Sequence, residues 1–236
     1  MPKADRLDGS DGAEHSGQMR SAGGWGINLA MPQALMLALH LRDAAGLTPP
    51  SSPIVPAFPP LDPPAHRLRT AGADLAGLEA AGQQWVRWWS AAFPGGPAAL
   101  TSILPPRFPG LAGMTELRGL AELGMDDAVS WCTRAREVEA GLLRSVPSAL
   151  FETNLVTDVE RQLGRAIRPF TLQVVVLPVR GSHSWDLPGG AVISLGLRAD
   201  RDAYLEWLRT KLVAIGQWRA TSADPAEHTD RPAPPV

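Results

Sequence analysis

A dense run of eight prolines between residues 48 and 66 sets the strongest limit on the architecture of this chain. Proline fixes its own φ angle, lacks a backbone N–H and disfavours helical geometry at the preceding residue. The run therefore excludes a helix and favours extended backbone of the polyproline type, which at about 3.1 Å per residue spans on the order of 60 Å. We expect a strap or spacer that lets an N-terminal helix dock far from the point where the chain resumes.

The sequence on either side of this run indicates one globular body with tails. The chain has 236 residues, which is sufficient for one sizeable domain. Its two ends carry few large apolar side chains, so burial there cannot offset the entropy of ordering. The expected organisation is, in chain order, a disordered tail over 1–24, a helix within 25–47, the proline-rich linker over 48–66, one globular α+β domain over 67–220 and a disordered tail over 221–236.

Apolar residues recur at intervals of three and four in six segments, which predicts about six helices. The first helix is expected to open near Pro32 and to stop at Gly46. Gly124 is expected to close a short helix before the next helix begins at Asp126. The predicted helices cover residues 32–46, 71–93, 115–124, 126–146, 154–167 and 200–216.

The C-terminal third also contains two segments with the periodicity of strands. Residues 170–179 are apolar on both faces, as in a covered strand, and residues 191–197 alternate as in a half-buried strand. A hairpin between them is the simplest pairing. Because an isolated hairpin is marginal in water, the strands must pack on helices or meet a further strand, for which residues 101–104 are a candidate. The sequence therefore predicts a mainly helical α+β fold with one C-terminal β-hairpin in a helix–strand–strand–helix unit.

The connection over residues 180–190 is long for a hairpin and carries the best candidate binding residues, Arg180, His183, Trp185 and Asp186. Longer ordered loops are enriched in binding roles. Serine, histidine and aspartate are also the residue types of a nucleophilic triad, but neighbouring side chains on an extended segment point apart, and the nucleophile-elbow motif is absent. Partner contact, catalysis and a structural turn held by its own polar groups are all open interpretations, and the structural turn is favoured.

Three tryptophans follow one another closely in the predicted helix 71–93. Trp85 and Trp89 lie on its apolar stripe, and Trp88 lies at the shoulder of that stripe. Packing inside the molecule is the favoured interpretation, because one amphipathic helix usually buries its aromatic side chains. A recognition surface is the alternative, so Trp88 is kept as a candidate partner contact.

Arg161, Arg165 and Arg168 recur at helical spacing and are expected to form a basic ridge. The net charge of −2 gives no long-range attraction for a phosphate backbone. A solvated helix face is therefore the favoured interpretation, and weak nucleic-acid binding is the alternative.

Cys132 is the only cysteine, which excludes an intramolecular disulfide and a multi-cysteine metal site and fits a reducing compartment. His40, His66 and His183 show no metal-ligand spacing, so we expect no metal and no cofactor. The longest apolar run, residues 31–41, is too short for the roughly 20 residues that cross a bilayer. We expect a soluble cytoplasmic protein, and the excess of arginine over lysine indicates a GC-rich bacterial genome.

No catalytic or metal-binding constellation can be assembled from spacing alone. The favoured function is therefore that of a non-catalytic interaction or accessory protein, whose partner is another protein rather than a membrane or a nucleic acid. It would contact that partner through the tethered N-terminal helix, through the 180–190 loop, or through both. A small hydrolase-like enzyme with a pocket at the 180–190 loop is the alternative, and a weak nucleic-acid binder using the arginine ridge is the second alternative.

Overall fold

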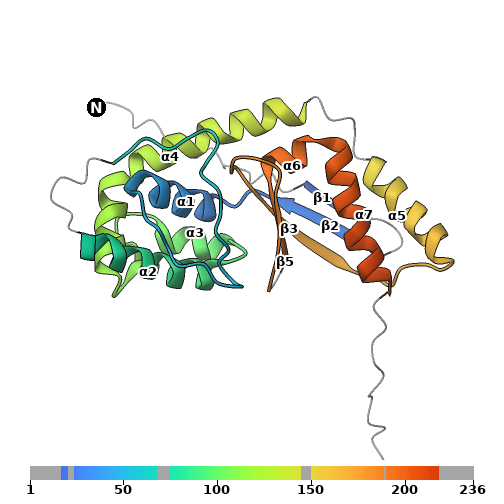
Figure 1. Cartoon of the computed structure of the whole chain (residues 1–236), viewed down its shortest axis with the longest axis horizontal. Helices are drawn as coiled ribbons and strands as arrows, with labels where there is room; N and C mark the ends of the chain where they lie inside the picture. The colour runs from blue at the N-terminus through green and yellow to red at the C-terminus, as the bar shows by residue number, and fades with distance from the viewer. Residues whose placement is uncertain (1–16, 21–23, 69–74, 145–149, 189, 218–236) are drawn as a thin grey trace, which may run out of the picture.

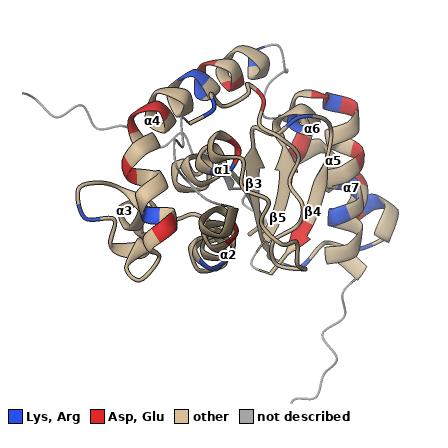
Figure 2. Ribbon diagram, turned by 60° about the vertical axis from the view of Figure 1, so that its left-hand side comes forward, with Lys and Arg blue, Asp and Glu red and all other residues tan. Residues whose placement is uncertain are grey.

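The computed structural model describes residues 17–20, 24–68, 75–144, 150–188 and 190–217. These residues form three layers, in which a mixed β-sheet lies between two groups of helices (Figure 1 and Figure 2). One face carries α1 (Gln33–Ala45), α2 (Leu75–Ala92), α3 (Pro97–Ile103), the short 3₁₀ helix η1 (Pro109–Leu111) and α4 (Thr115–Leu143). The other face carries α5 (Leu150–Leu163), α6 (Leu195–Ala199) and α7 (Arg201–Gln217). The predicted mainly helical α+β fold is confirmed.

Within the described residues, the sheet has five strands in the order β1-β2-β3-β5-β4. They are β1 (Gly17–Arg20), β2 (Gly26–Ala30), β3 (Thr171–Leu177), β4 (Ser184–Leu187) and β5 (Gly190–Ser194). The three central strands β2, β3 and β5 run parallel, and each edge strand runs antiparallel to its neighbour. Consecutive residues Val174, Val175 and Val176 of β3 are all buried, as expected of a strand covered on both faces.

The strand pairing differs from the predicted hairpin. Strands β3 and β5 are parallel neighbours, with Val175 opposite Val192, and the hairpin partner of β5 is β4, which lies inside the predicted 180–190 loop. The predicted strand 191–197 ends at Ser194 because the Ser194 hydroxyl accepts a hydrogen bond from the Leu197 N–H at 3.2 Å and caps α6. The hairpin prediction was therefore wrong in its pairing, although a C-terminal hairpin exists.

Two strands come from the N-terminal region, where no strand was predicted. Residues Gly17–Arg20, placed by the sequence in a disordered tail, form β1 against β2. Strand β2 pairs in parallel with β3, with Ile27 opposite Leu172. A parallel partner so distant in sequence leaves no local turn signal. The rest of the predicted N-terminal tail, apart from residue 24, and the predicted C-terminal tail lie outside the described residues.

The helices differ from the prediction in three places. Helix α4 is continuous through Gly124, where an added Cβ would lie 3.0 Å from Leu68 and 3.2 Å from Leu41, so this glycine serves close packing rather than helix termination. The candidate strand 101–104 is largely helix α3. Helix α5 ends at Leu163, because Gly164 adopts a left-handed conformation with φ of 67°.

Helix α1 occupies the centre of the helical layer instead of hanging from a spacer. Eleven of its thirteen residues are buried, and it packs against α2 and α4. The Trp85 Nε1–H of α2 donates a hydrogen bond to the Ala38 carbonyl at 2.7 Å. Because nearly all of its residues are buried, α1 has no free face to offer a partner, so its predicted role as a docking element was wrong. None of the helices in the described ranges has the length and apolar character needed to span a membrane.

Candidate functional site

The proline-rich segment over residues 48–66, called the strap below, contains no helix, as predicted, but it is not extended throughout: it turns between Ser52 and Val55, whose backbone groups exchange hydrogen bonds, and three of its side chains enter the core. Its apolar side chains Val55, Phe58 and Leu61 are buried. Leu61 forms a β-bridge with Val179, and the Arg180 N–H donates a hydrogen bond to the Pro60 carbonyl at 2.8 Å. The strap therefore lies against the end of β3 and cannot act as a spacer.

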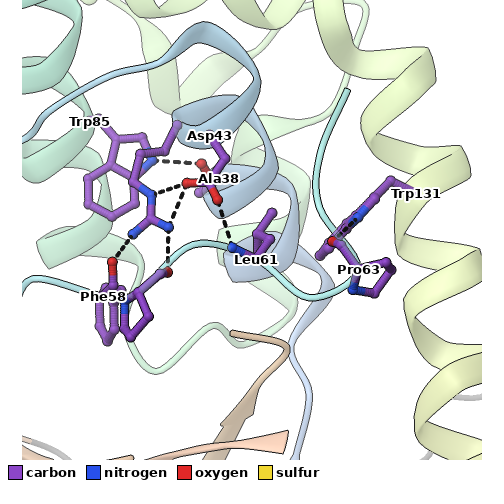
Figure 3. A network of polar contacts seen from close by, with 9 residues as sticks. Ala38, Asp43, Phe58, Leu61, Pro63, Trp85 and Trp131 are labelled. Carbon is purple, nitrogen blue, oxygen red and sulfur yellow. Dashed lines mark hydrogen bonds and ion pairs between the residues drawn. The ribbon is translucent and has the colours of Figure 1, made fainter. Parts of the chain in front are cut away.

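The C-terminal turn of α1 holds the strap by charged side chains (Figure 3). The buried Arg42 guanidinium donates to the Phe58 carbonyl at 3.1 Å and to the Pro59 carbonyl at 2.9 Å. Asp43 accepts the Leu61 N–H at 2.7 Å and the Arg42 Nε–H at 2.6 Å. Burial lowers the pKa of Arg42, and the neighbouring Asp43 carboxylate opposes that shift. The pair is an anchor for the strap.

A tryptophan of α4 fixes the far end of the strap. The Trp131 Nε1–H donates to the Pro63 carbonyl at 2.9 Å (Figure 3). Prolines offer carbonyl acceptors but no N–H donors, so strap carbonyls that face the helices need side-chain donors. Arg42 and Trp131 supply these donors from two different helices.

A pocket of about 490 Å³ lies between the end of α1 and the strap, and we call it the strap pocket. Its lining includes the apolar side chains of Trp85, Phe58 and Val55. Its polar lining includes Asp43, which is half-buried, and Arg67, which is exposed. An apolar lining with a few polar groups is the usual composition of a site that receives a side chain or a small ligand.

Aromatic rings connect the strap pocket to the region around β4. Trp85 stacks on Trp89 at 5.0 Å between ring centroids, Trp89 meets Phe58 at 5.1 Å, and Phe58 meets Trp185 at 5.1 Å. The exposed His183 ring stacks on Trp185 at 5.6 Å. We call the strap pocket together with Arg180, His183 and Trp185 the strap–β4 surface.

The sequence-predicted residues of the 180–190 segment divide between two faces of the sheet. His183 and Trp185 lie on the strap side, whereas the Asp186 carboxylate pairs with Lys211 of α7 on the opposite side. Side chains two apart on a strand share a face, and His183 and Asp186 are three apart. The structure therefore keeps Arg180, His183 and Trp185 close to one another and separates Asp186 from them.

Neither Ser184 nor Ser194 is placed as a nucleophile for His183. Ser184 precedes Trp185 on β4 and faces the other side of the sheet. The Ser194 hydroxyl is buried and accepts hydrogen bonds from the backbone N–H groups of His183 and Leu197. The pocket that the hydrolase-like alternative requires from His183 and Asp186 is not formed by these two side chains.

Trp88 does not reach the surface, which corrects its candidacy as a partner contact. Its side chain is 2% exposed, and its Nε1–H donates to the Ser102 hydroxyl of α3 at 3.2 Å. Helix α3, which the sequence did not predict as a helix, covers the shoulder of the α2 stripe.

The arginine ridge is also absent as a helical face. Arg161 pairs with Asp158 at 2.6 Å, and Arg165 donates to the Gly216 carbonyl near the end of α7. Arg165 and Arg168 follow the end of α5 at Leu163, so they cannot share a helix face with Arg161. The shared helix face of three arginines, on which the nucleic-acid alternative was based, does not exist in the described structure.

Cys132 and His40 are buried groups of the helical layer. Burial raises the pKa of the Cys132 thiol to about 12, with a smaller opposing effect from Arg136, so the thiol stays protonated at neutral pH. His40 Nε2 lies 3.0 Å from an Asp127 carboxylate oxygen, in an approach that is not aligned as a hydrogen bond. Burial lowers the pKa of His40, and Asp127 opposes that shift. The contact ties α1 to α4.

A buried polar cluster that sequence reasoning missed joins α5, α6 and α7. Tyr204 donates its hydroxyl to the fully buried Glu152 carboxylate at 2.7 Å. Arg198 Nη2 lies 3.6 Å from the same oxygen, and its guanidinium lies 4.3 Å from the centre of the Tyr204 ring. Burial is the larger cause, and Glu152 the next, of a raised Tyr204 pKa. The three residues come from separate helices, so no sequence spacing reports them.

No group of three or more potential metal ligands among histidine, cysteine, aspartate and glutamate occurs in the described ranges. A comparison of the chain with protein-family models, curated proteins and solved structures found no match. The function must therefore be argued from the strap–β4 surface itself.

Proposed function

We propose that this chain is a non-catalytic interaction protein that binds a polypeptide partner on the strap–β4 surface. One observation carries the proposal: two residues that line the strap pocket of about 490 Å³ contact the 180–190 segment, Phe58 through the half-buried Trp185, on which the exposed His183 ring stacks, and Pro60 through the backbone N–H of the exposed Arg180. A partly covered tryptophan beside arginine is the composition that dominates binding energy in protein interfaces. Of the two contact regions expected from the sequence, the 180–190 segment remains, and the buried helix α1 does not.

The side chains of Arg180 and His183 are available to a partner. Arg180 uses its backbone N–H for the strap, and no described residue makes an ion pair or hydrogen bond with its guanidinium. The His183 ring stacks on Trp185 and lies beside Gly181, and no described residue makes a hydrogen bond or ion pair with it. A partner group therefore displaces no existing salt bridge when it binds here, so desolvation is the main electrostatic cost.

The chemical state of the remaining candidates supports a binding role. The Cys132 thiol is buried and protonated, and the Ser194 hydroxyl is occupied by two backbone donors. Neither the Cys132 thiol nor the Ser194 hydroxyl is therefore available as a nucleophile that His183 could activate. As part of the same proposal, the free thiol of the single cysteine fits a cytoplasmic location.

Site-specific photo-crosslinking in cells of the source organism tests the proposal. A photo-reactive amino acid replaces His183 in one variant and Arg107 in a matched control. Both side chains are exposed, and Arg107 lies between α3 and η1, outside the strap and the 180–190 segment. We expect a defined protein adduct at position 183 that is absent at position 107. The adduct should fade when Arg180→Glu is added. Equal labelling at both positions, or an adduct that ignores Arg180→Glu, would contradict the proposed surface.

A further inference from the structure

Strand β4 presents an open edge beside the strap–β4 surface. It is the last strand of the sheet, and β5 is the only described strand that pairs with it. Its residues Ser184 and Asp186 are exposed. An open strand edge carries backbone N–H and C=O groups that another extended chain can bind.

The register of the hairpin identifies which backbone groups face outward. The Ser194 N–H donates to the His183 carbonyl at 2.9 Å, and Trp185 lies opposite Val192. In an antiparallel ladder every second residue directs its N–H and C=O to the neighbouring strand. His183 and Trp185 therefore direct their backbone groups to β5, and Ser184 and Asp186 direct theirs to the open side.

The side chains along this edge differ on its two faces. On the strap side, the half-buried Trp185 leaves part of its ring uncovered. The exposed Arg180 precedes the strand, and its backbone N–H bonds the Pro60 carbonyl of the strap. On the other side, Lys211 already neutralises Asp186. Within residues 180–188, Arg180 is therefore the charged side chain without a described ion-pair partner, and it is complementary to an acidic side chain.

We propose that the partner binds as an extended segment that adds a strand to β4, with an apolar side chain against Trp185 and an acidic side chain beside Arg180 and His183. The proposal rests on the proposed function and specifies how that surface binds. Two outward residues supply two N–H and two C=O groups, which suits a short peptide. A stable dimer of this chain needs roughly 800 Å² from each subunit, far more than a strand of four residues offers at its edge.

A phage-displayed library of random nine-residue peptides, selected on the full chain, supplies the probe. We expect the selected peptides to contain acidic and β-branched residues, and Arg180→Glu to weaken their binding. N-methylation is then placed at each peptide position in turn, and affinity is measured by isothermal titration calorimetry. Methylation at alternate positions should weaken binding roughly tenfold, because only every second peptide N–H faces β4. A loss pattern without this alternation would overturn strand addition.

A proline substitution tests the edge from the side of the protein. Ser184→Pro removes one outward N–H and leaves the hydrogen bonds to β5 in place, since that N–H does not face β5. It should bind the selected peptides roughly tenfold more weakly than Ser184→Ala, which keeps the N–H. Equal losses in the two variants would overturn the proposal. Circular dichroism and the urea midpoint confirm that both variants fold.

The outcomes separate the two proposals. Peptides that depend on Arg180 and His183 but show no alternation would overturn strand addition and leave the proposed function standing. Failure to select any peptide that depends on these side chains would overturn both. A dimer of the chain that sedimentation detects and Ser184→Pro dissociates would assign the edge to a second copy, which also overturns the peptide proposal.

Discussion

Replacing Arg42 by methionine tests whether the strap is part of the folded core. Methionine keeps the apolar length of the side chain but removes the donors to the Phe58 and Pro59 carbonyls. It also leaves Asp43 without its cation. The strap then keeps the Leu61 N–H bond to Asp43 and the Trp131 bond to the Pro63 carbonyl but loses both hydrogen bonds from Arg42. The substitution therefore isolates the contribution of one guanidinium to strap docking.

The size of the effect follows from the geometry of the pair. Arg42 is 6% exposed, so solvent screens its hydrogen bonds very little. A hydrogen bond to a charged group contributes about 1.5–3 kcal/mol, and removal of one partner from a buried ion pair costs about 3–5 kcal/mol. We expect Arg42→Met to lower the free energy of unfolding by about 3–5 kcal/mol. That is a large share of the roughly 5–15 kcal/mol that stabilises a typical domain.

Urea unfolding followed by tryptophan fluorescence measures this loss, because Trp85 and Trp131 lie beside the strap. With a slope of about 2 kcal/mol per molar urea, the midpoint should fall by about 2 M. The exposed Arg107→Met serves as the control and should stay within about 0.5 kcal/mol of the parent protein. Hydrogen exchange at the Leu61 N–H should accelerate in Arg42→Met alone. A loss below about 1 kcal/mol would refute the view that the strap is anchored by Arg42.

Three further predictions concern buried groups. Tyr204→Phe leaves the Glu152 carboxylate short of a donor and should lower stability by about 1–3 kcal/mol in chemical denaturation. The pKa of His40 in the native state is lowered below its unfolded value of 6.5, so in acid the unfolded chain binds more protons than the native chain. Stability should therefore be highest above pH 6.5 and fall as the pH drops below it. Urea midpoints at several pH values should show this slope in the parent and in His183→Ala but not in His40→Gln. Cys132 should react with a thiol reagent only under denaturing conditions, and rapid reaction of the native protein would contradict its burial.

The parts of the fold that could be predicted from sequence depend on local signals. Residues 170–179 have the composition of a covered strand, and β3 lies there. Asp200 was expected to cap the last helix, and its carboxylate accepts the Ala203 N–H at 3.1 Å. The pairing of β2 with β3 has no such signal, because the partners are far apart in sequence and are joined by neither a turn nor a single helix. Strand β4 was hidden because four residues are too few to establish a period.

The candidate site was predictable to the extent that its chemistry is local. Arg180, His183 and Trp185 were identified because one segment carries them, and the structure keeps them near one another. Asp186 was included by proximity in sequence, yet an extended backbone directs it to the opposite face, toward Lys211. The strap pocket was missed because its lining comes from α1, α2 and the strap, whose association is a matter of tertiary packing.

The position of the strap depends on which side chains can donate hydrogen bonds to its backbone carbonyls. Each proline brings a carbonyl acceptor without an N–H donor, so strap carbonyls that face the helices must be met by side chains that donate. Arg42 and Trp131 are such side chains, and each lies on the buried side of a helix. A sequence in which a proline run follows an apolar helix containing an arginine therefore predicts a strap packed on that helix. The spacer interpretation considered only that prolines prevent a helix. It did not consider that the carbonyls of the segment need hydrogen-bond donors.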